Sequence, residues 1–522
     1  MTTAPLVTRP FDLPDTPPEA ALPSLLNPGG RLPDAAAPSD ALTDLHLDAV
    51  IEAMAPEPFQ QAAWRLLPDD PVVVAGRQAV VRDLRRPEIR VAADDFIAAV
   101  TDARAAIAAA AGSHYALPAQ LRLLAALRRF AESVRGFAGQ LAGRRPELAG
   151  LGAVADVLAG YLGGPQYAEL SDGSATLLAD LCGPAATLGV VTDTVWADAD
   201  GGEPPWGALV QDLFARFAGS PPLGEDRPLA RPRRDLNHIE AQAVGLIAQL
   251  RPEPFGRLRT FLARPAATVH PELIRLADEL RFFLGCLRVV DELAARGVRW
   301  CLPRVTPAPG AVDVRGMIDL ALALSVPDAL PVPNDLRLAA GQREVFVTGP
   351  NQGGKTTFAR AVGQLAWMAA LGLPVPAASA TLPLHRPVLT HFPRPDDPAR
   401  QRGGLAEELA RLRDVLRSAS PSALVILNEL LSTTSVDDAL QVSRLALRSF
   451  AGIGCRVLWV TFLDDLVSGA SGAVSLVGQL AADDPTRPTF EFREQPPAGH
   501  AHARFLAARY GLSADDLARR LR

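Results

Sequence analysis

Residues 349–356 match a phosphate-binding loop, in which two glycines enclose four residues and are followed by lysine and a hydroxyl residue. An apolar run over Glu344–Thr348 precedes the loop, and a helical pattern over Thr357–Ala370 follows it. Glycines let backbone N–H groups surround a phosphate, and the start of the helix adds partial positive charge. The other interpretation is a glycine-rich turn that binds no ligand. The spacing favours a nucleotide site made of Gly349, Pro350, Asn351, Gln352, Gly353, Gly354, Lys355, Thr356 and Thr357.

The lysine of this loop is unusual for the chain as a whole. Of 52 lysine and arginine residues, Lys355 is the single lysine. An ammonium group is a compact point charge that enters a ring of phosphate oxygens, whereas a guanidinium group is a planar fork. We therefore expect Lys355 to neutralise the β- and γ-phosphates of ATP and the Thr356 hydroxyl to take a position on Mg²⁺.

A second motif is the apolar run Ala423–Leu427, which ends in the polar pair Asn428 and Glu429. An apolar strand that ends in two polar residues is typical of the second motif of nucleotide hydrolases. We expect Asn428 to hold Mg²⁺ and Glu429 to orient or deprotonate the attacking water. An amide oxygen brings no charge, so weaker metal binding is expected than with aspartate. The other interpretation of Glu429 is a surface acid without a catalytic role.

Four hydroxyl residues lie between this motif and a helical pattern over Val436–Phe450. One interpretation is helix capping, with Ser435 as the cap and Asp438 three residues later. The other is a loop presented to the nucleotide of a neighbouring subunit, and both can hold together. The segment consists of Ser432, Thr433, Thr434 and Ser435.

The two halves of the chain differ in pattern. Apolar residues spaced three and four apart predict a mostly helical body before residue 300, with few strand signals and a loop at Gly201–Arg234. After Trp300, short apolar runs alternate with helical segments, which predicts an α/β P-loop NTPase domain with a largely parallel sheet. The expected helices cover Asp95–Ala111, Pro118–Gly143, Ile239–Leu250, Pro254–Arg264 and Pro271–Arg296, and the expected strands include Asp313–Ser325, Glu344–Thr348, Ala423–Leu427 and Arg456–Thr461.

These patterns predict four parts. Residues 1–40 form an irregular, partly disordered lead-in rich in proline and alanine, and residues 41–300 form a helical lever domain. Residues 301–498 form the P-loop domain, and residues 499–522 form a helical tail.

Composition restricts the class of protein. The net charge of −6 is not typical of a nucleic-acid binder. Two stretches, Arg77–Arg90 and Arg227–Arg234, are rich in arginine, and we interpret them as solvated helix faces in preference to DNA-contact patches. We expect neither a signal peptide nor a membrane span. The four cysteines are too scattered for a metal site or a disulfide framework. Among the histidines, only His500 and His502 have the spacing of metal ligands, and we interpret this pair as surface residues. A reduced cytoplasmic protein is expected.

The stretch from about residue 330 to 522 resembles the ATPase domain of the MutS (DNA mismatch repair) superfamily. Its phosphate loop contains the Pro-Asn pair that separates this family from most other P-loop proteins. The matching segments occur in the family's order and are Val332–Asp335, Thr348–Thr357, Leu371–Ala377 and Gly499–Leu521, while Pro68–Leu84 is similar to the opening of the family's helical core.

The resemblance implies an ATPase domain of the ABC and MutS type with ATP and Mg²⁺ as cofactors. It also implies a homodimer that uses residues 499–522, in which the loop at 432–435 closes over the partner's ATP. Double-stranded DNA is the implied macromolecular partner.

Three features depart from the family. Residues 1–70 contain nothing similar to the family's mismatch-reading domain with its phenylalanine wedge. The serine-rich loop before the second motif is replaced by Gln401–Glu408, and Phe462 stands where the family has histidine. These departures suggest a shorter MutS-related branch with slow or switch-like turnover.

Two functional hypotheses follow. The first is a MutS-like ATPase that couples its nucleotide state to DNA binding, in mismatch repair or a related DNA transaction. The alternative is a nucleotide-dependent scaffold for proteins that hydrolyses little ATP and does not read mismatches.

Overall fold

The chain folds into two compact units in the computed structural model. The first is built from residues 87–147 and 152–277, and the second from residues 23–86, 148–151 and those after 277. Residues 41–86 and 278–300, which we expected in the helical domain, thus belong with the second unit. The structure describes residues 22–28, 39–112, 116–182, 187–191, 194–198, 238–394, 404–431, 434–470, 472–484 and 486–496.

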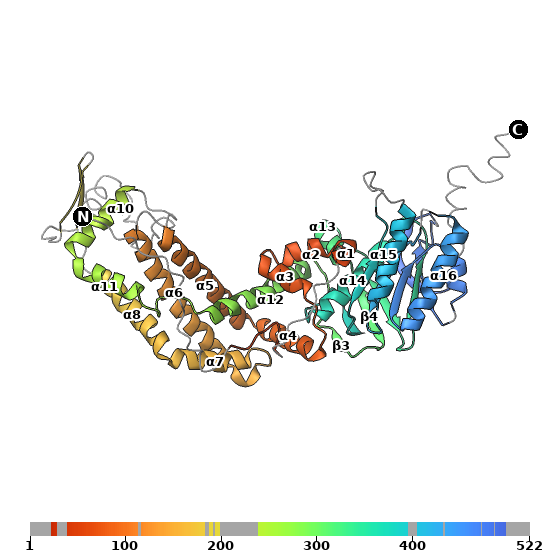
Figure 1. The fold of residues 1–522 in the computed structure, drawn as a ribbon, viewed down its shortest axis with the longest axis horizontal. Helices are drawn as coiled ribbons and strands as arrows, with labels where there is room; N and C mark the ends of the chain where they lie inside the picture. The colour runs from red at the N-terminus through yellow and green to blue at the C-terminus, as the bar shows by residue number, and fades with distance from the viewer. Residues whose placement is uncertain are drawn as a thin grey trace. The chain divides into compact units, whose positions relative to one another are not determined.

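The first unit is largely helical, as the three- and four-residue spacing predicted. Helices α5 and α6 run side by side (Figure 1), and Phe96 stacks on Phe137 between them with ring centroids 5.4 Å apart. The helices are α5 (Pro87–Gly112), α6 (Ala116–Gly143), η1 (Arg145–Glu147), α7 (Gly152–Gly163), α8 (Pro165–Leu181), α10 (His238–Leu250), α11 (Pro252–Leu262) and the start of α12 (Pro271–Ala295).

This unit also contains an antiparallel hairpin that the sequence did not lead us to expect. Strand β1 (Thr187–Val191) pairs with β2 (Thr194–Asp198). Two five-residue strands are too short to stand out beside long helical patterns. The expected loop at 201–234 lies outside the described residues. In the part of the chain that is described, no helix has the length and apolar character needed to cross a bilayer.

The second unit begins with short helices before its sheets. They are α1 (Ser39–Asp44), α2 (Leu47–Met54), α3 (Pro58–Arg65) and α4 (Pro71–Leu84). The aspartate before α4 forms its N-cap, because the Asp70 side chain accepts a hydrogen bond from Val72 N at 2.8 Å. Of the expected lead-in, residues 22–28 have no helix or strand and Ser39 already starts α1, while residues 1–21 and 29–38 lie outside the described part.

A six-stranded sheet carries the two sequence motifs. Its order is β12-β11-β6-β10-β9-β8, and every pairing is parallel except that of β11 with β12. Such strands are buried on both faces and read as continuous apolar runs, which explains why the sequence predicts them well. The strands are β6 (Glu344–Thr348), β8 (Val388–His391), β9 (Leu424–Asn428), β10 (Arg456–Val460), β11 (Val474–Leu480) and β12 (Pro488–Glu494).

A second sheet has the order β3-β7-β4-β5 and mixed pairing. The prediction of one strand over Asp313–Ser325 was wrong in its second half, which forms helix α13 (Leu320–Ser325). The reason is a cap, because the Asp319 side chain accepts a hydrogen bond from Leu322 N at 3.1 Å. The strands are β3 (Arg304–Thr306), β4 (Val312–Met317), β5 (Asn334–Leu338) and β7 (Ser379–Pro383).

Helices cover both faces of the six-stranded sheet. Helices α15 (Gly404–Ser418), α16 (Val436–Ile453) and α17 (Asp464–Ser468) pack on one face, around a core that includes Phe346 and Trp459. Helix α14 (Lys355–Ala370) contacts strands of both sheets and is buried along most of its length. A helix that is apolar on nearly all sides needs such a position between two layers.

Two buried histidines lie near the ends of strands in this core. Burial, reinforced by Arg456, lowers the pKa of His385 to about 4, and burial with Arg411 lowers that of His391 to about 4. Arg456 Nη1 is 3.3 Å from His385 Nε2, and His391 Nε2 is 3.1 Å from the Glu408 carbonyl oxygen. Both rings are therefore neutral in the folded protein at neutral pH.

We predict that acid destabilises this unit below about pH 6.5. The unfolded histidines bind protons from their ordinary pKa of 6.5 downward, whereas the folded ones resist protonation until about pH 4. Each histidine should therefore lower the free energy of unfolding by up to about 1.4 kcal/mol per pH unit in that window. Urea unfolding between pH 4.5 and 7.5 measures the slope. A double variant, His385→Gln with His391→Gln, should have a shallower slope, and an unchanged slope would contradict the assignment.

Candidate nucleotide-binding site

Three parallel strands end at the same edge of the six-stranded sheet. Asn428 at the end of β9 lies beside Val460 of β10, and Glu429 N donates to the Val460 carbonyl oxygen at 2.9 Å. On the other side of β10, Thr461 N donates to the Val347 carbonyl oxygen of β6 at 3.1 Å. The topology thus brings the phosphate loop after β6 and the polar pair after β9 to one place.

Glycines shape the loop between β6 and α14. Gly349 has a φ of 131° and Gly354 a φ of 87°, and both values favour glycine. A Cβ atom on Gly349 would lie 2.9 Å from the Gly478 nitrogen of β11, so the backbones approach too closely for a side chain. Gly354 is the residue before α14, which begins at Lys355 itself.

Lys355 points into the loop that precedes it. Its Nζ donates to the carbonyl oxygens of Gly349 and Pro350 at 3.2 and 3.1 Å and lies 3.4 Å from Asn351 Oδ1. The side chain is 5% exposed, and Nζ is 3.9 Å from a carboxylate oxygen of Glu429. Burial lowers the pKa of Lys355, and Glu429 partly offsets that shift. The ammonium thus donates to backbone oxygens, and phosphate oxygens could replace these as its hydrogen-bond acceptors.

Thr356 and Asn428 bring two neutral oxygens together, since Thr356 Oγ1 donates to Asn428 Oδ1 at 3.3 Å. Both belong to the donor set that Mg²⁺ takes, which is oxygen ligands. Among the described residues there is no group of three histidine, cysteine or acidic side chains that could hold a metal ion. A cation here would therefore need phosphate oxygens and water as further ligands, as Mg²⁺ does in nucleotide complexes.

Glu429 is held by the residues that follow it. Its φ is 50°, and Leu431 also has a positive φ, of 59°. Leu430 and Leu431 are 3% and 1% exposed and pack in the core, whereas the Glu429 side chain is 34% exposed. The two leucines thus anchor a strained turn that leaves the carboxylate accessible beside Lys355.

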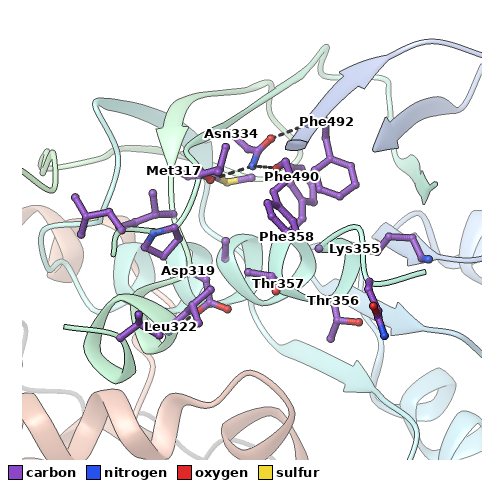
Figure 2. Close-up of a pocket in the computed structure, with 18 of the residues that line it drawn as sticks. Met317, Asp319, Leu322, Asn334, Lys355, Thr356, Thr357, Phe358, Phe490 and Phe492 are labelled. Atoms are coloured by element: carbon purple, nitrogen blue, oxygen red, sulfur yellow. Dashed lines mark hydrogen bonds between the residues drawn. The ribbon is translucent and has the colours of Figure 1, made fainter. Parts of the chain in front are cut away.

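A cavity of about 700 Å³ lies against the loop and reaches the second sheet. Figure 2 shows Lys355, Thr356 and Thr357 along the start of α14, with Asp319 and Leu322 lying apart from them. The far part of the cavity is mostly apolar. Its lining there includes Leu322, Val326, Leu330 and Val332, and the apolar surface continues to Phe490 beside the loop.

A bridge between β5 and β12 forms one wall of this cavity. Asn334 Nδ2 donates to the Phe490 carbonyl oxygen at 3.0 Å, and Phe492 N donates to Asn334 Oδ1 at 2.8 Å (Figure 2). Phe490 has a φ of 63°, is 45% exposed, and would lie 3.2 Å from a Cβ atom on Gly354. Its ring therefore stands at the loop and faces the open cavity.

The residues of the expected inter-subunit loop are only partly described. Ser435 caps α16, accepting from Asp438 N at 3.2 Å and donating to its carboxylate at 2.7 Å, as the capping interpretation predicted. Thr434 lies in the turn before it. Ser432, Thr433 and the tail at 499–522 lie outside the described residues. Phe462, which follows β10, is 45% exposed.

Known proteins match this part of the chain. The family model for MutS domain V matches residues 345–495, which span the phosphate loop, the polar pair and β12. Over these residues the chain is similar to MutS domain V. The match begins within β6 and ends just beyond β12, so it covers the six-stranded sheet and the edge that carries the phosphate loop and the polar pair.

Individual MutS-family proteins are similar over a larger share of the chain. DNA mismatch repair protein MSH3 of Cryptococcus neoformans is 30% identical over 190 residues, or 36% of this chain and 16% of that protein. DNA mismatch repair protein MutS of Syntrophobacter fumaroxidans is 30% identical over 222 residues, or 42% and 24%. MutS of a Synechococcus strain is 28% identical over 298 residues, or 56% and 32%. The chain thus spans a third or less of these relatives' length.

Proposed function

We propose that the protein binds ATP with Mg²⁺ at this edge and hydrolyses it. The observation that carries the proposal is the placement of the chain's single lysine, 3.9 Å from Glu429 and inside a complete phosphate loop. Lys355 and the N-terminus of α14 would bind the β- and γ-phosphates. Thr356 and Asn428 would hold the Mg²⁺ ion, which would neutralise charge on the phosphate oxygens. Glu429 would accept a proton from water or orient it.

The metal site offers a direct test. Because Asn428 brings no charge, Asn428→Asp should lower the Mg²⁺ concentration that gives half-maximal ATP binding. We expect a change of roughly three- to tenfold, since one added carboxylate beside the cation contributes about 1 kcal/mol once the cost of burying its charge is set against the attraction. A Mg²⁺ titration at fixed ATP measures it. Identical titrations for both proteins would place the metal elsewhere.

We assign the apolar part of the cavity to the nucleoside. Phe490 and the aliphatic side chains around Leu330 offer a surface for a base, while the loop takes the phosphates. Phe490→Ala should weaken ATP binding by roughly tenfold, because stacking of a base on an aromatic ring contributes about 1–3 kcal/mol. Calorimetry measures the affinity.

Inorganic tripolyphosphate supplies the control for this prediction, because it has the phosphates without the base. Phe490→Ala should leave its affinity unchanged. Equal weakening for ATP and tripolyphosphate would mean that Phe490 only shapes the loop. If the affinity for neither ligand were weakened, the assignment of this cavity to the base would be wrong.

The similarity to mismatch repair proteins supports a role in which nucleotide state controls DNA binding by a homodimer. The experiment is binding to plain, mismatched and branched duplexes with and without ATP, each over a salt series. Binding that responds to ATP and falls steeply with salt is expected, because phosphate contacts release counterions. Absence of DNA binding in every nucleotide state would favour the protein scaffold, which the net charge of −6 suits better.

A further inference from the structure

One side of α14 is attached to the short helices at the start of the second unit. The attachment points on α14 are spaced by four, three and four residues, so they follow one face of the helix away from the phosphate loop. Each is a hydrogen bond with a backbone carbonyl group. Arg360 Nε donates to Asp44 O at 3.1 Å, Gln364 Nε2 to Leu45 O at 2.9 Å and Trp367 Nε1 to Trp64 O at 3.0 Å, while Leu371 O accepts from Arg77 Nη1 at 3.2 Å.

Gln364 also contacts the wall of the nucleotide cavity. Its side chain is fully buried, and Nε2 donates to Asp319 Oδ1 at 2.8 Å, while Oε1 accepts from Leu320 N at 2.7 Å. Asp319 lines the cavity and caps α13. One amide therefore holds the phosphate helix, the cavity wall and the turn at Leu45. If the amide were lost, Leu45 O, Asp319 Oδ1 and Leu320 N would each lose a hydrogen bond in a buried site.

The same contact is tight in its apolar packing. A Cβ atom on Gly363 would lie 2.4 Å from Leu45 Cδ2 and 2.9 Å from Ile426 Cδ1. Leu45 itself is fully buried. Only glycine therefore lets Leu45 pack directly on the α14 backbone, about two turns from Lys355. Because of this contact, α14 cannot shift without displacing Leu45.

We propose that residues 39–65, here called the docking segment, are part of the nucleotide site and stabilise it through Gln364. The inference rests on the proposed function. Nucleotide binding fixes the start of α14 and the cavity wall, and the docking segment fixes the same helix and wall from the other side. By thermodynamic reciprocity, nucleotide must then strengthen docking of the segment to the same extent that docking strengthens nucleotide binding. Gln364 acts as a positioning residue and touches no nucleotide.

The test combines hydrogen exchange with nucleotide affinity on the full chain. A non-hydrolysable ATP analogue with Mg²⁺ should slow amide exchange in residues 39–54 of the wild type. Gln364→Leu keeps the volume and removes the hydrogen bonds. It should abolish that protection and weaken analogue binding by roughly fivefold or more, the lower end of usual coupling between sites.

Gln78→Leu is the matched control, because Gln78 is also buried and its side-chain amide donates to the Pro303 carbonyl oxygen at 2.7 Å instead of to a group of α14 or the docking segment. It should lower the melting temperature in a similar way and leave both the analogue affinity and the protection intact. Arg360→Met is a second variant in case Gln364→Leu does not fold. It removes one attachment from a partly exposed side chain and should reduce protection with a smaller loss of affinity.

The outcomes separate this inference from the proposed function. If the wild type binds the analogue but residues 39–54 exchange as before, or if Gln364→Leu and Gln78→Leu bind equally, the docking role is wrong and nucleotide binding stands. If the wild type binds no nucleotide at all, both are wrong. Loss of protection and affinity in Gln364→Leu, but not in Gln78→Leu, supports the coupling.

Discussion

Lys355→Ala is expected to weaken ATP binding by roughly two orders of magnitude. The ammonium is buried among carbonyl oxygens of its own loop, and bound phosphates would be its strongest partners. Truncating one partner of a buried charge pair costs about 2–5 kcal/mol, and every 1.4 kcal/mol is a factor of ten in affinity. Calorimetry with ATP and Mg²⁺ measures the change. If Lys355→Ala bound ATP with wild-type affinity, the assignment of the nucleotide site to this loop would be wrong.

Lys355→Arg is the informative companion variant, because it keeps the charge and matches the residue that the rest of the chain uses. A planar guanidinium should not fit the ring of oxygens that a point charge fits, so we expect weak binding here too. The single lysine also allows a chemical test on the wild type. An amine-selective reagent should modify Lys355 slowly in the presence of ATP and faster without it, and peptide mass mapping separates this site from the chain's terminal amine.

The loop and the polar pair could be predicted from sequence because their signals are local. Gly349 and Gly354 need positive φ values, and each motif directly follows a run of buried residues in a parallel strand. Parallel strands end at one edge, so the approach of Asn428 to Thr356 follows from the pattern once the sheet is assumed. Its distance of 3.3 Å does not.

The far wall of the cavity could not be predicted, because its contacts join remote segments. Asn334 and Phe490 are 156 residues apart in the chain, and the Asn334 side-chain amide donates to the Phe490 backbone carbonyl, an acceptor that no side-chain pattern reveals. Asp319 caps a helix inside a segment that looked like one continuous strand, and Gln364 looks like one polar residue on an apolar helix. The place of residues 41–86 in the second unit depends on the same kind of contact. Their helical periodicity predicts that they form helices, but it does not reveal which element those helices pack against.

Glu429→Gln is expected to preserve ATP binding and slow hydrolysis by roughly a hundredfold or more. Glutamine keeps the size and can fit the turn that Leu430 and Leu431 anchor, but it cannot accept a proton from water. General base catalysis contributes about 10²–10⁴ in rate. Single-turnover measurements with radiolabelled ATP separate the chemical step from binding and product release.

The charge of Glu429 makes a further distinction possible. Its carboxylate lies 3.9 Å from Lys355 Nζ and on the side where phosphates would bind, so it opposes their negative charge. Removing it should therefore leave ATP affinity equal or slightly higher, whereas a residue that merely holds the loop would lose affinity and rate together. Asp414→Asn is the matched control, since Asp414 is an exposed acid on α15 that pairs with Arg413 and should leave the rate unchanged. Equal rates for Glu429→Gln and the wild type would exclude Glu429 as the base. Hydrolysis would then depend on another group, for which the loop at 432–435 of a partner subunit is the first candidate.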